Sequence, residues 1–273
     1  MNYIKKPIIL FFTYLAWAST IHAETNAITF GIVPQQSASR LASIWVPICK
    51  YLSKHTGVTI NFKTAPNIPE FEKRLEKGEY DISYMNPYHY VYFHKHIGYQ
   101  AFAKAKNRSI NGIIVAHKDS KIKTLADLSG KEIAFPSPAA FAASILPRAE
   151  LSQKNIIFTP KYVSSHDSVY KNVSKKFAIA GGGIKRTFNS FTKSERDNLV
   201  IIWKTKSYTP HALAHHPSMQ LKIISKIQNA FEEFANSQNG RYLLKPLKIE
   251  GFEYASNKDW DDIRALNISL LEK

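Results

Sequence analysis

The sequence predicts an α/β protein of two lobes, each a mainly parallel sheet flanked by helices, with two hinge crossovers between them. Strand-like and helix-like patterns alternate along the chain, which is the order expected of α/β folds. The patterns fall into two sets, and the 273 residues are enough for two lobes. Because no repeat or low-complexity linker separates the sets, we expect the middle lobe to be an insertion into the first.

The first set of elements begins with an alternating strand over residues 27–36, which ends at glycine and proline signals. Residues 38–57 carry apolar side chains at spacings of three and four and close on a glycine suited to a helix C-cap. A strand over 58–65, a helix closing at Gly78 and a buried strand that breaks at Pro87 follow. This alternation of strands and helices predicts that residues 27–87 form part of an α/β first lobe.

The second set begins near residue 112 and contains five apolar strand patterns and two helix patterns. The strands are expected at 112–117, 131–135, 156–163, 177–183 and 198–205, and the helices at 124–130 and 165–176. After Ser207 the chain becomes helical, with Gly240 as the expected stop. We therefore assign residues 24–115 and 207–273 to the first lobe and 116–206 to the second.

The first 23 residues have the pattern of a secretory signal peptide. Lys5 and Lys6 precede an apolar run over residues 7–18, and a small residue stands before Glu24. The run is shorter than the roughly 20 residues that cross a bilayer, although an uncleaved membrane anchor is the alternative. We expect export to the periplasm.

The chain is strongly basic, with 37 lysines and arginines against 21 acidic residues and a net charge of +16. Without residues 1–23, which hold two lysines and no acid, 35 basic and 21 acidic residues would leave +14. The basic residues are dispersed and no nucleic-acid-binding motif accompanies them, so no nucleic-acid partner is expected. A basic surface that attracts small anions fits this pattern better.

Five segments, in this order, resemble the phosphate, phosphite and phosphonate solute-binding proteins of ABC transporters, which have the type 2 periplasmic binding protein fold. They are FGIVPQ (30–35), residues 78–91, residues 123–144, SSHDSVYKNV (164–173), and AGGGIKRTF (180–188) with residues 210–219. The resemblance implies a monomeric, non-enzymatic protein without a cofactor. It would close over a small anionic ligand and present that ligand to a transporter permease.

The first-lobe motif of this family corresponds to residues 81–90. It places Tyr84, Asn86 and Tyr88 at the edge of the ligand cleft. The alternative is an aromatic turn that packs in the core.

The second-lobe motif departs from the family pattern. After Pro138 the family has a run of hydroxyl residues that opens a helix and holds the phosphonate oxygens, and this chain has alanines and a phenylalanine there. Ser137 is expected as the N-cap, backbone donors survive, and the apolar residues favour a ligand with hydrophobic surface beside its acid. The expected contacts are Ser137, Ala139, Ala140, Phe141 and Ala142.

Three more positions follow from the resemblance. His166 and Ser168 match a loop that contacts the anion, although a solvated histidine and a helix cap at Asp167 are the alternatives. Gly182 lies in a glycine run that permits close backbone approach. The acidic residue that the family places before these glycines is absent, so an aminoalkyl phosphonate is not expected.

Other classes of function have weaker support. Neither the serine-hydrolase elbow nor the complete phosphate-binding loop of nucleotide hydrolases is present, which argues against an enzyme. His211, His215 and His216 lie between two prolines in an expected extended crossover, so no metal site is assigned. Delivery of a ligand signal to a membrane sensor kinase stays open, because sensing and uptake use the same lobe closure.

Overall fold

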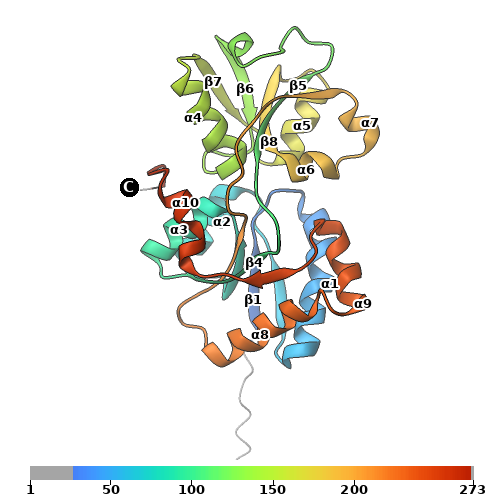
Figure 1. Ribbon diagram of the computed structural model, residues 1–273, viewed down its shortest axis with the longest axis vertical. Helices are drawn as coiled ribbons and strands as arrows, with labels where there is room; N and C mark the ends of the chain where they lie inside the picture. The colour runs from blue at the N-terminus through green and yellow to red at the C-terminus, as the bar shows by residue number, and fades with distance from the viewer. Residues whose placement is uncertain (1–26, 272–273) are drawn as a thin grey trace, which may run out of the picture.

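The computed structural model describes residues 27–271 as two α/β lobes, one above the other in Figure 1. The middle of the chain forms the upper lobe, and the N-terminal and C-terminal parts together form the lower lobe. The expected signal peptide lies outside the described residues. Within residues 27–271 no helix combines the length and apolarity that a membrane crossing needs.

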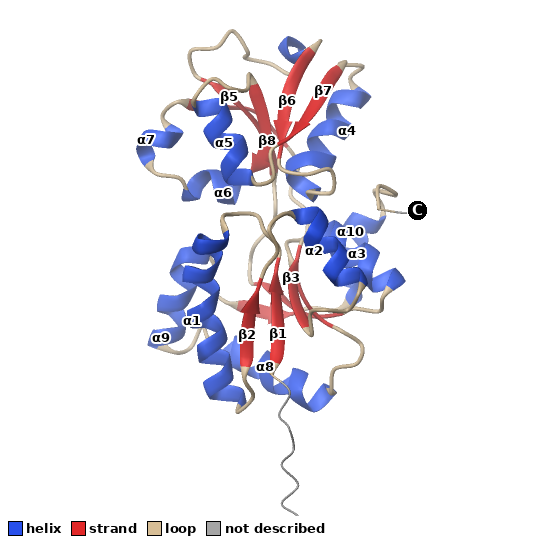
Figure 2. Cartoon of the chain, turned by 180° about the vertical axis from the view of Figure 1, so that it is seen from behind, coloured by secondary structure: helices blue, strands red, loops and turns tan. Residues whose placement is uncertain are grey.

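The first lobe is built on a six-stranded sheet in the order β11-β4-β10-β3-β1-β2. Strand β1 pairs in parallel with β2 and β3, and the other pairings are antiparallel. The strands are β1 (Ile28–Ile32), β2 (Ile60–Lys63), β3 (Ile82–Met85), β4 (Gln100–Ala105), β10 (Ala212–His215) and β11 (Phe252–Tyr254). The helices that flank the sheet (Figure 2) are α1 (Ala38–Thr56), α2 (Ile68–Glu76), α3 (Pro87–His96), α8 (Leu221–Glu233), α9 (Gln238–Leu244), η3 (Lys245–Leu247), η4 (Asn257–Trp260) and α10 (Asp261–Arg264).

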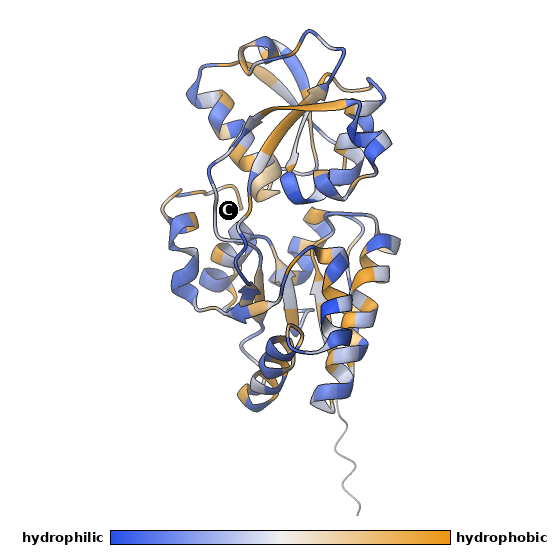
Figure 3. Ribbon diagram, turned by 45° about the vertical axis from the view of Figure 1, so that its right-hand side comes forward, coloured by the Kyte–Doolittle hydropathy of each residue, from blue (hydrophilic) through white to orange (hydrophobic). Residues whose placement is uncertain are grey.

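The second lobe is built on a five-stranded sheet in the order β7-β6-β8-β5-β9. Its strands are β5 (Gly112–His117), β6 (Lys131–Phe135), β7 (Phe158–Tyr162), β8 (Ala180–Ile184) and β9 (Leu199–Lys204). Figure 3 shows hydrophobic strands within this lobe, where β5 is buried along its whole length, whereas the edge strand β7 is mostly exposed. The helices are η1 (Ala126–Leu128), η2 (Phe141–Ile145), α4 (Leu146–Gln153), α5 (His166–Ser174), α6 (Lys185–Ser190) and α7 (Lys193–Arg196).

The predicted two-lobe α/β architecture is confirmed, but both sheets are mixed rather than mainly parallel. The chain crosses between the lobes over residues 106–111 and 205–211 without a helix. The strands next to these crossovers pair antiparallel with their neighbours, as β5 does with β8 and β9 and as β10 does with β3 and β4. The second sheet starts at Gly112, ahead of the expected boundary at residue 115.

Helix α1 shows how the sequence sets the local structure of the first lobe. The Ser37 side chain accepts a hydrogen bond from the Arg40 N–H, and Gly57 ends the helix in the left-handed conformation. Trp45, on the buried face, packs edge-on against Phe30 of β1 with ring centroids 5.4 Å apart. This face holds α1 against the sheet.

The predicted helix stop at Gly240 is wrong. Helix α8 ends at Glu233, and a new helix, α9, contains Gly240. The Ser237 side chain accepts a hydrogen bond from the Gly240 N–H at 2.9 Å and so begins α9. A serine cap therefore divides the predicted single helix in two.

The glycine run lies inside strand β8 rather than at its end. A Cβ at Gly182 would overlap the Ala143 carbonyl oxygen and the Phe135 ring, and one at Gly183 would overlap Tyr170. The glycines therefore let η2 and α5 pack directly on the backbone of β8. This close packing fixes where both helices begin at the cleft.

We expect Gly182→Ala to lower the free energy of unfolding by about 1–3 kcal/mol, because the new methyl group would push η2 away from β8. Urea denaturation measures the change. Gly251→Ala is the control, since its Cβ would meet only the Ala235 Cβ, at 3.1 Å. Equal stability of Gly182→Ala and the wild type would contradict this account of the packing.

Candidate functional site

The two lobes are in direct contact across the cleft. The Asn86 side-chain amide donates to the Ala139 carbonyl at 3.2 Å, and the His166 backbone N–H donates to the Gln35 carbonyl at 3.2 Å. Ala139 and His166 belong to the second lobe, and Asn86 and Gln35 belong to the first. The described arrangement is therefore a closed one.

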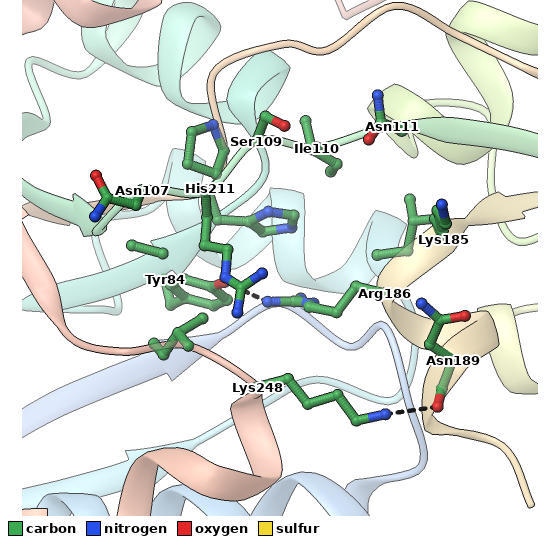
Figure 4. Close-up of a pocket in the computed structure, with 15 residues that line it drawn as sticks. Tyr84, Asn107, Ser109, Ile110, Asn111, Lys185, Arg186, Asn189, His211 and Lys248 are labelled. Atoms are coloured by element: carbon green, nitrogen blue, oxygen red, sulfur yellow. Dashed lines mark hydrogen bonds between the residues drawn. The ribbon is translucent and has the colours of Figure 1, made fainter. Parts of the chain in front are cut away.

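Arg186, near the start of α6, is the cation at the centre of this contact. Its guanidinium donates to the Tyr84 hydroxyl at 2.9 Å (Figure 4) and to the Gln35 side-chain oxygen at 2.8 Å. The Gln35 amide nitrogen lies 2.6 Å from His211 Nε2, and the His211 ring stacks on Tyr84 with centroids 4.9 Å apart. Strand β3 and the loop after β1 thus present neutral polar groups to one guanidinium, and His211 of the return crossover contacts both of these groups.

A cavity of about 470 Å³ opens beside this cluster. Tyr84, Arg186 and His211 form part of its wall, together with both crossovers and the segment after η3. The other cationic lining residues are Arg108, Lys185 and Lys248, and none of the described residues that line the cavity is acidic. The cavity lies in the size range of small-molecule sites and is suited by charge to an anion.

Two histidines at the cleft are held neutral. Burial, and then the charge of Arg186, lower the pKa of His166 to about 3. Burial, followed by Arg186, also lowers the pKa of His211 well below its usual value. Arg186 is therefore the fixed positive charge in this cluster, and the histidines act as neutral hydrogen-bonding groups.

The structure divides the predicted site residues into separate groups. Tyr84 lines the large cavity. A second, small void of about 10 Å³ also lies between the lobes, with room for one water at most. The predicted residues that line it are Asn86, Ala140, Phe141, Ala142 and His166.

The segment that precedes η2 differs from the prediction at Ser137. The helix begins at Phe141, its N-cap is Ala140, and no side chain caps it. The prediction of Ser137 as N-cap is therefore wrong, because residue 140 is still extended and its carbonyl accepts the first hydrogen bonds of the helix. The Ser137 hydroxyl is buried and has no hydrogen-bond partner among the described residues, and Phe141 packs edge-on against Tyr208 of the return crossover, with centroids 5.6 Å apart.

Three predicted contact residues do not face the cavities between the lobes that are described above. The Tyr88 hydroxyl accepts a hydrogen bond from the Leu271 backbone N–H at 2.8 Å, so this ring packs in the first lobe. The Ser168 hydroxyl lies 2.9 Å from that of Ser165, the residue that caps α5. Gly182 is covered by η2. None of the three lines the cavity beside Arg186 or the small void.

Sequence reasoning missed Arg186, Gln35 and His211 as site residues. Arg186 stands three residues after the glycine run, and Gln35 ends the first family segment, so both were within recognised motifs. Their side chains meet only because β1 and β8, which belong to different sheets, end at the same cleft. Among residues 27–271 no group of three or more potential ligands is placed to hold a metal ion.

Two α/β lobes joined by two crossovers, with a basic cavity where they meet, have the architecture of a two-lobe solute-binding protein whose cavity is suited by charge to an anion. A family profile described as "ABC transporter, phosphonate, periplasmic substrate-binding protein" matches residues 30–260. The chain therefore belongs to the phosphonate periplasmic substrate-binding proteins of ABC transporters, a family of the periplasm, and its predicted resemblance is confirmed.

Individual relatives agree with this assignment. The phosphate-import protein PhnD of Mycolicibacterium smegmatis is 22% identical over 275 residues, which cover 86% of this chain and 78% of that protein. PhnD1 of Prochlorococcus marinus, solved with methylphosphonate, superposes with a TM-score of 0.84 at 15% identity, covering 91% of this chain and 100% of PhnD1. A binding protein component of a Pseudomonas aeruginosa phosphonate transporter superposes with a TM-score of 0.82 at 18% identity, covering 90% of this chain and 86% of that protein.

We expect the stability of the protein to fall as the pH drops from about 6.5 toward 3. In the unfolded chain His166 takes up a proton near its usual pKa of 6.5, whereas in the folded protein its pKa is about 3. At pH 5 this one group contributes a loss of about 2 kcal/mol relative to pH 7.5. Urea denaturation at the two pH values measures it.

His166→Gln removes this titration, so its stability should fall by less than that of the wild type between pH 7.5 and pH 5. His55→Gln, a change at an exposed histidine, should lose as much stability between these pH values as the wild type. If the His166→Gln variant lost as much stability between pH 7.5 and pH 5 as the wild type, the low pKa of His166 would not be the cause of that loss.

Proposed function

We propose that this chain captures a small phosphorus oxyanion, of the phosphonate or phosphate class, between its lobes and delivers it to an ABC transporter permease. The signal-like residues 1–23 would direct it to the periplasm. It would work as a monomer and release its ligand chemically unchanged.

The observation that carries this proposal is the environment of Arg186. Its two hydrogen bonds across the cleft end on the neutral oxygens of Tyr84 and Gln35. A cleft guanidinium bonded to neutral partners keeps its charge available for an anionic ligand, and its planar fork matches the oxygens of a phosphonate. The relatives bind ligands with such oxygens, as their names state.

Arg186 also offsets the loss of hydroxyls in the second-lobe motif. Hydrogen bonds to charged oxygens contribute about 1.5–3 kcal/mol each, and the alanines of η2 supply none from their side chains. A guanidinium can supply two such bonds together with a full positive charge. The charge of the ligand would thus be met by Arg186 from the second lobe and by backbone donors at η2.

Closure of the lobes follows from the same contacts. Arg186 lies on the second lobe, and Tyr84, Gln35 and His211 lie on the first. When the lobes part at the two crossovers, the cluster separates and the ligand can enter. An anion bound to Arg186 would then be enclosed as the donors of the first lobe return, which favours the closed form that a transporter recognises.

We expect Arg186→Gln to weaken binding of methylphosphonate or inorganic phosphate by about 10- to 100-fold, because it removes charge-assisted hydrogen bonds. Arg186→Lys should retain part of the affinity, since it keeps the charge and loses the fork. Isothermal titration calorimetry measures both.

Arg40→Gln is the matched control for this experiment. Arg40 of the first lobe donates to the Ser190 carbonyl of the second lobe at 3.1 Å, so it too bridges the lobes, but it does not line the cavity. Its loss should change affinity by less than about threefold. An equal loss in the two variants would mean that Arg186 only holds the lobes together, and the proposal would fail.

A further inference from the structure

We propose that the ligand carries two separate anionic groups, one bound by Arg186 within the cleft and the other by Lys248 at the mouth of the same cavity. This inference rests on the proposed function and deepens it. The proposed ligands are phosphorus oxyanions in general, and the inference narrows them to phosphonates or phosphate esters that carry a second acidic group.

The first ground is the concentration of positive charge around the cavity. Arg108 comes from the first crossover, Lys185 and Arg186 from α6, and Lys248 from the segment after η3. Like charges on one cavity repel each other, and none of the described lining residues is an aspartate or glutamate that would offset them. The other three cations are exposed to solvent, and a second anionic group near them would gain favourable interactions that a single oxyanion at Arg186 would not.

The second ground is the placement of two of these cations. Arg186 is anchored inside the cleft by Tyr84 and Gln35, while the Lys248 ammonium donates to the Asn189 carbonyl at 2.6 Å (Figure 4). The two cations therefore hold different positions on the wall, each bonded to neutral oxygens. A ligand that meets both must carry its negative groups apart.

The third ground is that Lys248 belongs to the first lobe and reaches the second. It follows η3 in the left-handed conformation, with φ 54° and ψ 40°. Its side chain contacts Asn189 of α6 only when the lobes are closed, as they are here. A second anionic group bound by Lys248 would thus be engaged on closure, in addition to the group bound by Arg186.

The size of the cavity agrees with a ligand of this kind. Its volume of about 470 Å³ exceeds what a phosphonate with a methyl substituent fills. The remaining wall holds polar side chains, among them Asn107, Ser109 and Asn111, which can bond a second acid or its linker. A cationic substituent would meet like charges and no carboxylate among the described lining residues.

Three phosphonates that differ in the second group test the proposal by calorimetry on the purified protein. They are phosphonoacetate, with a carboxylate; methylphosphonate, with no second charge; and 2-aminoethylphosphonate, with an ammonium. We expect phosphonoacetate to bind at least about tenfold tighter than methylphosphonate, and 2-aminoethylphosphonate to bind weakest.

Lys248→Gln should reduce the preference for phosphonoacetate over methylphosphonate from about tenfold to about twofold. Lys245→Gln, which removes a nearby exposed lysine that does not line the cavity, should keep the full preference. Added salt should reduce the preference in the wild type, because the groups at the mouth are exposed.

Equal affinities for phosphonoacetate and methylphosphonate, or tightest binding of 2-aminoethylphosphonate, would overturn the two-anion inference and leave the proposed function standing. So would a preference that survives Lys248→Gln unchanged. Absence of binding by all three compounds would instead overturn the proposed function itself.

Discussion

The contact of Arg186 with Tyr84 and Gln35 is the interaction on which the rest of the cleft depends. It joins a strand end of each lobe and leaves a positive charge bonded to neutral oxygens. The same charge, added to burial, keeps His166 and His211 unprotonated. One guanidinium therefore links the two lobes, carries the charge of the site and adds to the effect of burial on the two histidines.

Close packing on strand β8 puts Arg186 in place. The glycines of β8 admit η2 and α5 at backbone distance, and α6 follows this strand directly. The alanines of η2 then pack against the first lobe, with Phe141 set against the return crossover. The segment that corresponds to the hydroxyl-rich motif is here a mostly apolar interlobe contact, and the cation of the cleft, Arg186, comes from the start of α6.

The adjoining cavity extends this arrangement toward solvent. Its cations come from segments far apart in the sequence, and Lys248 spans from the first lobe to the second. A basic protein attracts anions in general, but a cavity with localised cations selects among them by the number and spacing of their charges.

The sequence by itself determined the two-lobe α/β fold, most strand and helix positions and the family, because hydrophobic periodicity, caps and ordered motifs are local properties. It also brought Tyr84, Asn86, Phe141 and His166 to the cleft. Only the tertiary structure decided that the sheets are mixed, that Tyr88 and Gly182 turn away, and that Arg186 meets Gln35 and His211. These outcomes depend on how strands of two sheets end at one cleft, which residue spacing along a single chain does not encode.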